Sequence, residues 1–252
     1  MKLNLEAASA EYEAGFAARL HKNTLAFVPA LLKSSLFSAR SGARTMYTTE
    51  AQLAGHSGAH VFYTGEELRQ DDLRVLLGLV KAREGSLITR ILKIAPREFA
   101  VEIGRADSST SVATIKASLI RLQQARVRVK TPKGEGYYSL VASVEFERGE
   151  WRVELSAKVA ELLASSTLTC LDKDARFAAK DGLQSWLYGA VRSDACFAPF
   201  SLEQLQGWTG LTGYATKEFA RVLRKELAGL QEAGEISGFT ITGGKTLKIQ
   251  KH

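Results

Sequence analysis

The stretch that decides the fold is VFYTGEELRQDDLRVLLGLVKAR, residues 61–83. Its first residues alternate like a short strand, with Val61 and Tyr63 on one side. Thr64 stands where a helix N-cap belongs and Glu67 follows three residues later, which predicts a capping box. Apolar side chains then recur at helical spacing, at Leu68, Val75, Leu76, Leu79 and Val80. A strand that leads into an amphipathic helix is typical of a small α+β domain.

The composition favours a two-domain, basic, globular protein. The chain has 252 residues, of which 45% are hydrophobic, and a net charge of +7. Such a charge favours an anionic partner, nucleic acid first and an anionic membrane surface second, although a basic protein without such a partner is the plain alternative. Cys170 and Cys196 are the two cysteines, which disfavours a disulfide framework or a structural zinc site. No apolar run is long enough to span a membrane and no signal peptide is evident, so we expect a cytoplasmic protein.

Residues 1–60 are interpreted as an N-terminal helix followed by an arm. Good helix formers predict a helix over 5–21, and residues 23–60 are loop-like because of Pro29 and clustered serines and glycines. Leu36, Phe37 and Met46 are expected to tether the arm to the body. A partner-binding tail is the alternative interpretation.

Residues 61–150 predict a first winged-helix domain. After the opening helix come a strand over 89–95 and a helix over 96–103 that begins at a proline and ends at Gly104. Residues 107–109 offer caps for a helix over 110–125. Its outward positions are Thr110, Thr114, Lys116, Ala117 and Arg121. A β-hairpin over 126–146 follows directly and is interpreted as the wing, and a further strand pair reaches Leu155.

Residues 151–252 repeat this scheme without a fixed sequence period. We expect a short helix over 156–164, a strand over 167–171 and a long helix from Asp172 to Arg192, interrupted at Gly182. Ser201 caps a helix over 202–208, and the longest regular helix runs over 214–233. A hairpin over 236–250 completes the unit. The predicted fold class is therefore α+β, with two tandem winged-helix domains.

The best candidate site is the helix over 214–233. Its apolar stripe is expected to be buried, while its other face is basic, with Thr216 at the start. An apolar back and a basic front suit the second helix of a helix-turn-helix that enters the DNA major groove. The alternative is a solvated basic face partly paired with Glu218. The candidate DNA-binding residues of this domain are Thr216, Lys217, Arg221, Arg224, Lys225, Lys245 and Lys248.

A second basic cluster surrounds the first predicted wing. No acidic residue lies between positions 121 and 133, and one sign of charge suits contact with the phosphate backbone. A β-ribbon at this place can instead pair edge to edge with another subunit, and both interpretations stay open. The candidates here are Lys116, Arg121, Arg126, Arg128, Lys130 and Lys133.

Several short motifs resemble those of enzymes or metal sites but lack residues that such sites require. The string GGKT at 243–246 lacks the earlier glycine of a phosphate-binding loop, because Phe239 stands in its place, and a hairpin turn is favoured. His56 and His60 lie in a glycine-rich loop without a third metal ligand. Asp71 and Asp72 fit the start of a helix better than a metal site. We therefore expect no catalytic residues, no metal and no cofactor.

Two segments carry a family resemblance: SSLFSARSG at 34–42 and FYTGEELRQDD at 62–72. The string YTG-x-ELR-x-DD within the second is the specific part. These segments resemble the TrfA-type replication initiators of broad-host-range plasmids. The resemblance implies tandem winged helices that bind direct repeats (iterons) in the plasmid origin, open the adjacent DNA, and recruit the host initiator and the replicative helicase. It also implies that the C-terminal unit makes the main repeat contacts and that the N-terminal unit adds backbone contacts and mediates a homodimer, with monomers active and dimers limiting copy number.

The sequence thus predicts a non-enzymatic bacterial DNA-binding protein that initiates plasmid replication. Three alternatives are a winged-helix repressor, including an autorepressor, a rolling-circle nicking enzyme, and an interaction module without DNA binding. A nicking enzyme needs a metal site and a nucleophilic tyrosine, and its His-x-His motif is missing.

Overall fold

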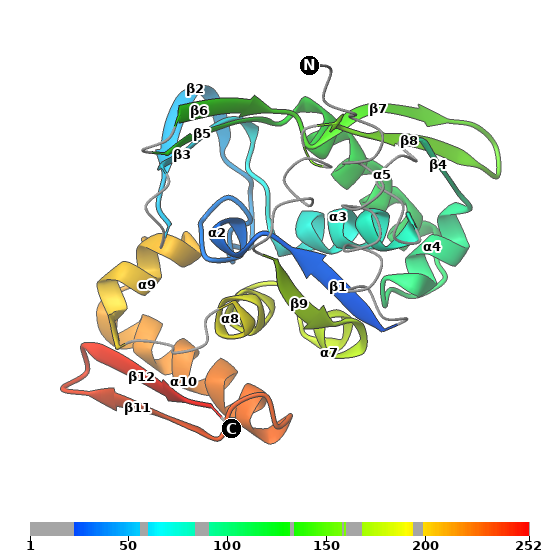
Figure 1. The fold of residues 1–252 in the computed structure, drawn as a ribbon. Coiled ribbons are helices and arrows are strands. Elements are labelled where there is room, and N and C mark those ends of the chain that lie inside the picture. The colour runs from blue at the N-terminus through cyan, green and yellow to red at the C-terminus, as the bar shows by residue number, and fades with distance from the viewer. Residues whose placement is uncertain are drawn as a thin grey trace, which may run out of the picture.

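Helix α3 (Gln70–Ala82) lies in the interior of the molecule (Figure 1). The computed structural model describes residues 23–55, 60–83, 91–131, 134–157, 159, 168–193 and 199–251. Every residue from Asp72 to Val80 is buried, because α3 contacts strand β1 (Thr24–Phe27) and helix α5 (Ser109–Gln124). The sequence pattern indicated one apolar face, whereas the helix is covered around its whole circumference. The helices expected over 5–21 and, for most of its length, 156–164 lie outside the described residues.

The start of α3 differs from the predicted capping box. Strand β3 (His60–Glu66) continues through Thr64, and the helix begins only at Gln70. Asp72, not Glu67, accepts the hydrogen bond from the backbone N–H of the N-cap residue Arg69, at 2.9 Å. Thr64 is therefore not the N-cap, because its backbone is engaged in sheet pairing with Arg126.

A first unit follows α3 in the order strand, helix, helix, hairpin. Helix α4 begins at a proline and ends before Gly104, whose φ of +73° suits glycine. The Ser108 hydroxyl caps α5 by accepting from the Ser111 N–H at 3.1 Å. The sheet order is β4-β8-β7. The remaining bounds are β4 Ile91–Ile94, α4 Pro96–Glu102, β7 Val141–Phe146 and β8 Trp151–Leu155.

A second unit repeats this order at the other end of the molecule (Figure 1). Its strand β10 precedes two helices and a hairpin, and its sheet order β10-β12-β11 matches that of the first unit. The turn between β11 and β12 uses Gly243 and Gly244 at positive φ, as expected for a tight hairpin. The bounds are α8 Leu183–Arg192, β10 Phe200–Ser201, α9 Leu202–Thr209, α10 Thr216–Glu232, β11 Gly238–Thr242 and β12 Thr246–Gln250.

The hairpin predicted as the first wing is divided between two sheets. Strands β5 and β6 belong to a four-stranded sheet of order β2-β3-β5-β6, while β7 pairs with β8. The expectation of one hairpin over 126–146 is therefore wrong: the hairpin that packs beside β4 spans 141–155. The strands of the larger sheet are β2 Met46–Leu53, β3 His60–Glu66, β5 Arg126–Thr131 and β6 Gly134–Tyr138.

The arm expected to be loop-like is part of the folded body. Strand β1 pairs antiparallel with β9 (Thr169–Asp172), and helix α2 (Pro29–Leu32) contacts α8. Leu36 and Phe37 are buried as expected, but the Met46 side chain is 60% exposed and is not part of the core. The arm thus joins segments that are about 150 residues apart in sequence.

The long helix expected from Asp172 to Arg192 is two helices, α7 (Lys173–Ala178) and α8. The Asp172 carboxylate caps α7 by accepting from the Ala175 N–H at 2.8 Å. Gly182 precedes α8 with a φ of +116°, a conformation outside any helix. The chain therefore turns between the two helices at the glycine that sequence reasoning identified as an interruption.

Candidate nucleic-acid interface

Helix α10 follows helix α9, whose start and end are both fixed by local capping. The Ser201 hydroxyl accepts from the Gln204 N–H at 3.1 Å while the Gln204 side chain accepts from the Ser201 N–H at 3.0 Å, which starts α9. Helix α9 ends at Gly210, with φ +76°. Four side chains then anchor α10 in the core, Phe219, Leu223, Leu227 and Leu230. The predicted apolar back of this helix is confirmed.

The opposite face of α10 is basic and exposed, as its spacing predicts. Lys217, Arg224 and Lys225 have no ion-pair partner among the described residues. Arg221 instead donates to both carboxylate oxygens of Glu218, at 3.0 and 2.6 Å. These hydrogen bonds raise the pKa of Arg221 and lower the pKa of Glu218. The pairing that the sequence left open therefore exists, and it occupies one of the four cations.

The other candidates of this unit are also exposed. Thr216, at the start of α10, is exposed, and so are Lys245 in the β11–β12 turn and Lys248 on β12. The Lys245 N–H donates to the Thr242 carbonyl at 3.1 Å, so the GGKT string forms a hairpin turn and no helix follows it. All seven candidate residues of this unit are thus at the surface.

Helix α5 presents a less basic face. Lys116 is exposed, with its ammonium 4.7 Å from the centre of the Phe146 ring on β7. Arg121 is not on the outer face as predicted, because its side chain is only 11% exposed and is paired with Asp72. Sequence reasoning missed this because helical spacing does not show that a carboxylate on α3 faces that position.

The cluster on β5 is also partly neutralised. Arg126 and Lys130 are exposed, whereas Arg128 lies over the Phe62 ring and pairs with Glu50 and Glu135. These pairs raise the pKa of Arg128. The run without acidic residues therefore meets acids from β2 and β6 in three dimensions. Lys133 lies outside the described residues.

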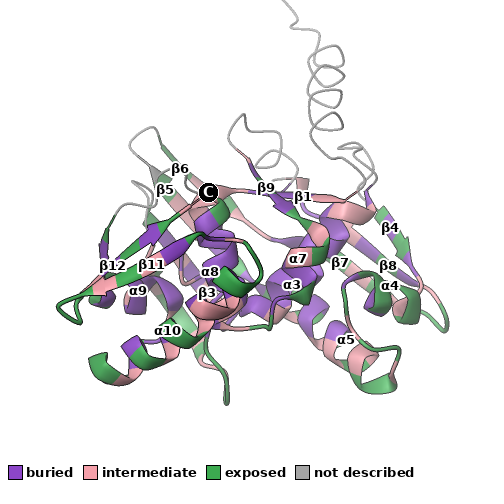
Figure 2. Cartoon of the chain, turned by 90° about the horizontal axis from the view of Figure 1, so that it is seen from below, coloured by how far each residue is buried: buried purple, intermediate pink, exposed green. Residues whose placement is uncertain are grey.

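Helices α5 and α10 lie along the same edge of the molecule (Figure 2). Each is the second helix of its unit, and each carries exposed residues among buried ones. The second helix of such a pair is the element that enters a major groove in helix-turn-helix proteins.

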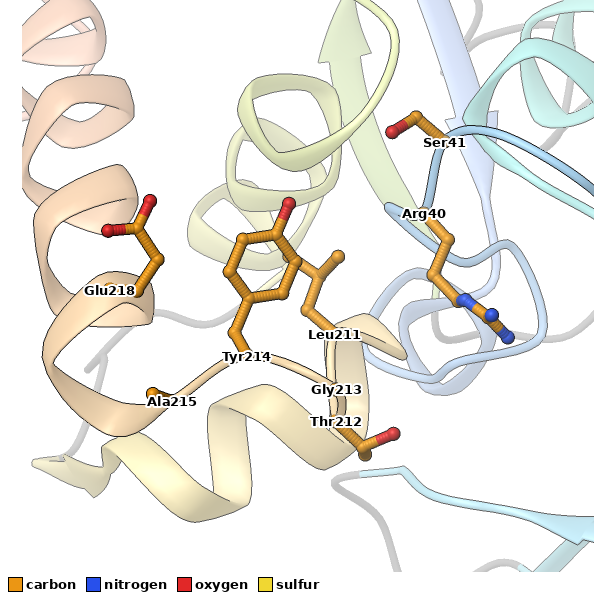
Figure 3. Close-up of a pocket in the computed structure, with 8 residues that line it drawn as sticks. All are labelled: Arg40, Ser41, Leu211, Thr212, Gly213, Tyr214, Ala215 and Glu218. Atoms are coloured by element: carbon orange, nitrogen blue, oxygen red, sulfur yellow. The ribbon is translucent and has the colours of Figure 1, made fainter.

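A loop between the two helices, missed by sequence reasoning, also reaches this region. Arg40 and Ser41 line one side of a pocket of about 570 Å³ whose other side is Tyr214 and Glu218 (Figure 3). The same two loop residues line a second pocket that Thr114 of α5 also lines. The signal for this loop in the sequence is two arginines, Arg40 and Arg44, around three small residues.

Neither metal ligation nor a membrane span is evident in the part of the chain that the structure describes. Across those residues, histidine, cysteine and carboxylate side chains do not gather in any group of three or more able to hold a metal. His60 makes a 3.0 Å contact through Nδ1 with the Gln52 amide, and His56 is outside the described residues. None of the described helices is long and apolar enough to cross a bilayer.

Two solved structures of RctB resemble this chain. The crystal structure of the selenomethionine derivatives of its domains 2 and 3 matches with a TM-score of 0.59 at 13% identity, covering 88% of this chain and 96% of that one. Another crystal structure of RctB domains 2–3 matches with a TM-score of 0.53 at 15% identity, covering 86% and 95%. No family model and no curated protein matches the sequence. The shared feature is therefore the fold, over nearly the whole of both chains.

Proposed function

We propose that this protein initiates DNA replication by binding direct repeats in duplex DNA through two winged-helix units. The observation that carries the proposal is the placement of α5 and α10 on one edge, with Lys217, Arg224 and Lys225 of α10 unpaired within the described residues. In each unit the strand, two helices and hairpin follow the order of a winged helix. The second helix would occupy the major groove and the hairpin would lie beside it.

The likeness in fold to RctB domains 2–3, over nearly the whole chain, supports the initiator class in this proposal. The string from Tyr63 to Asp72 resembles a second group of initiators, the TrfA type. We infer that the chain acts at a plasmid origin, where it would open adjacent DNA and recruit the host initiator and replicative helicase. The role is one of binding and assembly without a catalytic step.

The two units are proposed to have unequal roles. Helix α10 carries more exposed cations than α5 and would read the repeat, with arginine pairing to guanine and lysine to phosphate. The first unit would add backbone contacts through Lys116, Arg126 and Lys130. Strand β6 is an edge strand of its sheet, and its Tyr137 is 69% exposed, so this edge is the proposed place for a homodimer.

Binding to the DNA that flanks the protein's own gene tests the proposal. The competitor is a scrambled duplex of the same length at the same salt concentration, and the stoichiometry is recorded. Stepwise shifts with one protein per direct repeat are the expected result. Binding only to an inverted repeat at the promoter would favour a dimeric repressor, and equal weak binding to both duplexes would remove the proposal. Incubation of supercoiled origin DNA with Mg²⁺ or Mn²⁺ tests the nicking alternative, for which we expect no strand cleavage.

A further inference from the structure

The loop of residues 40–43, here called the bridging loop, lies between the two helices of the proposed interface. Arg40 and Ser41 share a pocket with Tyr214 and Ala215, just before α10 (Figure 3). With Gly42 they share a second pocket with Thr114 of α5. The loop is thus the element that connects the surfaces of the two units.

Hydrogen bonds and ion pairs to neighbouring segments fix the conformation of the bridging loop. The Ala39 N–H, at its start, donates to the Thr209 carbonyl at 2.8 Å. The Arg69 guanidinium donates to the carbonyls of Gly42 and Ala43, at 2.9 and 2.7 Å. Arg44, just after the loop, is paired with Asp71 and Asp72. A loop that is already ordered loses little conformational entropy when it binds a partner.

The bridging loop offers hydrogen-bond donors. The Arg40 side chain is 40% exposed, and its Nη1 donates to Thr45 Oγ1 at 3.1 Å and lies 3.7 Å from a carboxylate oxygen of Glu67. The backbone N–H groups of Ser41 and Gly42 have no hydrogen-bond partner among the described residues. Gly42 has a φ of +82° with open space where a Cβ would stand, so a ligand can approach the main chain closely.

The acids around the loop are already neutralised. Glu67 accepts from Arg69 at 2.9 Å, and Asp181 is paired with both Arg74 and Arg105. An anion that approaches the loop therefore meets a guanidinium and free N–H groups beside carboxylates that have cationic partners. This combination suits a phosphate group.

We propose that the bridging loop contacts the DNA sugar-phosphate backbone between the two segments bound by α5 and α10. The proposal rests on the DNA-binding function proposed above. Two helices that enter major grooves on one face of a duplex leave between them a minor groove edged by phosphates. Arg40 and the N–H groups of Ser41 and Gly42 would bind those phosphates. The contact would set the register of the protein without reading a base.

Phosphate ethylation interference and salt-dependent binding test this contact. The probe is the duplex that the wild-type protein protects in the DNA flanking its gene, with a scrambled duplex beside it. Arg40→Ala should remove interference at phosphates between the two groove contacts. It should also reduce the slope of log K against log salt by about 0.9, which is about a fivefold loss of affinity at 0.15 M salt. Ser41→Glu, which adds a negative charge at the same place, should weaken binding further, and both variants should affect the two duplexes equally.

Arg192→Ala is the matched control. Arg192 is 45% exposed, similar to Arg40, and it too has one carboxylate neighbour, Glu235. It lies at the opposite end of α8 from Gly182, which lines the loop pocket, so its replacement should leave affinity and slope unchanged. Thermal unfolding of each variant establishes that it is folded.

The outcomes separate this inference from the proposed function. If Arg40→Ala and Ser41→Glu bind like wild type while Arg224→Ala loses specific binding, the loop contact is wrong and the DNA-binding function stands. If the wild-type protein itself prefers neither duplex, both proposals fall. Loss of binding by the Arg192→Ala control to the same extent as Arg40→Ala would also overturn the loop contact, since the effect would then reflect net charge alone.

Discussion

Asp72 accepts two hydrogen bonds from Arg121, from Nε at 3.0 Å and from Nη2 at 2.9 Å, so that helix α5 is attached to helix α3 at a carboxylate with no exposed surface. The other oxygen of Asp72 accepts from Arg44 at 2.8 Å. One buried side chain thus joins the opening helix, the proposed DNA-facing helix of the first unit and the segment that follows the bridging loop. The acids of the string from Tyr63 to Asp72 therefore have a structural role.

Asp72→Ala should destabilise the protein by about 3–5 kcal/mol, because it leaves the largely buried Arg121 guanidinium without its hydrogen-bonded carboxylate, while Arg44 keeps its pair with Asp71. Chemical denaturation measures the loss. The matched control is Asp107→Ala, which breaks an exposed pair with Arg97 at 2.7 Å and should cost at most about 1 kcal/mol. Equal small losses for the two variants would show that the buried network is not important for stability.

Gly78→Ala in α3 should also destabilise the fold, although alanine normally favours a helix. A Cβ at this position would lie 2.3 Å from Ile103 Cγ2 and 3.0 Å from the Phe99 ring, so the core must shift, at about 1–3 kcal/mol. Gly189→Ala in α8 is the control. A Cβ at Gly189 would lie 3.4 Å from Leu32 Cδ2, which is an ordinary van der Waals contact, so we expect this variant to be up to about 1 kcal/mol more stable. Equal effects from the two changes would contradict this account.

Glu67 should make stability fall in acid. Burial opposes ionisation, but hydrogen bonds from Ser38, Arg69 and the Thr45 N–H outweigh it and lower the pKa of Glu67 in the folded state. Its contribution is therefore present above the unfolded value of about 4.5 and is lost as pH falls through the folded value.

Unfolding free energies of Glu67→Gln across this range test the assignment. The deficit relative to wild type should be largest near neutral pH and should shrink as the pH is lowered below about 4.5. The exposed Glu98, changed to Gln, provides the control, for which only a small loss is expected. If the loss of unfolding free energy in Glu67→Gln does not change with pH, the negative charge of Glu67 is not the source of its contribution to stability.

The basic face of α10 should respond differently to loss of cations and loss of its acid. Arg224→Ala should weaken specific binding by about 1–3 kcal/mol if this side chain reads a base. Arg221→Ala is expected to act in the same direction. Glu218→Ala should instead strengthen binding to any duplex, because it frees Arg221 and removes a negative charge. Unchanged affinity for both arginine variants would remove the recognition-helix assignment.

Replacement of Lys130, alone and with Lys133, distinguishes the two interpretations of the four-stranded sheet. If the sheet contacts DNA phosphates, all duplexes should bind more weakly and the salt slope should fall by about one unit for each lost contact. Gel-shift titrations at several salt concentrations give the slope, and analytical ultracentrifugation gives the oligomeric state. A change in dimerisation with an unchanged slope would identify the sheet as a protein interface.

Much of the secondary structure could be predicted because its causes are local. The caps at Ser108, Asp172 and Ser201 depend on side chains that bond within three residues of their own positions. The buried stripe and basic front of α10 follow from helical spacing along one segment. The β11–β12 hairpin follows from its two glycines. These features depend little on the rest of the chain.

The tertiary structure decided what depends on residues far apart in sequence. Helix α3 begins at Gln70 and not after Thr64, because β3 pairs with β5 as far as Thr64. Arg121 is largely buried and not on the outer face, because Asp72 of another helix accepts its hydrogen bonds. The first predicted wing was divided because β5 pairs with β3 and thereby places β6 at the edge of the four-stranded sheet. Charge and periodicity determined which faces are basic. Only the tertiary packing decided which of these charges are paired within the described residues. An ion pair requires two side chains to lie close together, and the sequence does not give the distance between residues that are far apart along the chain.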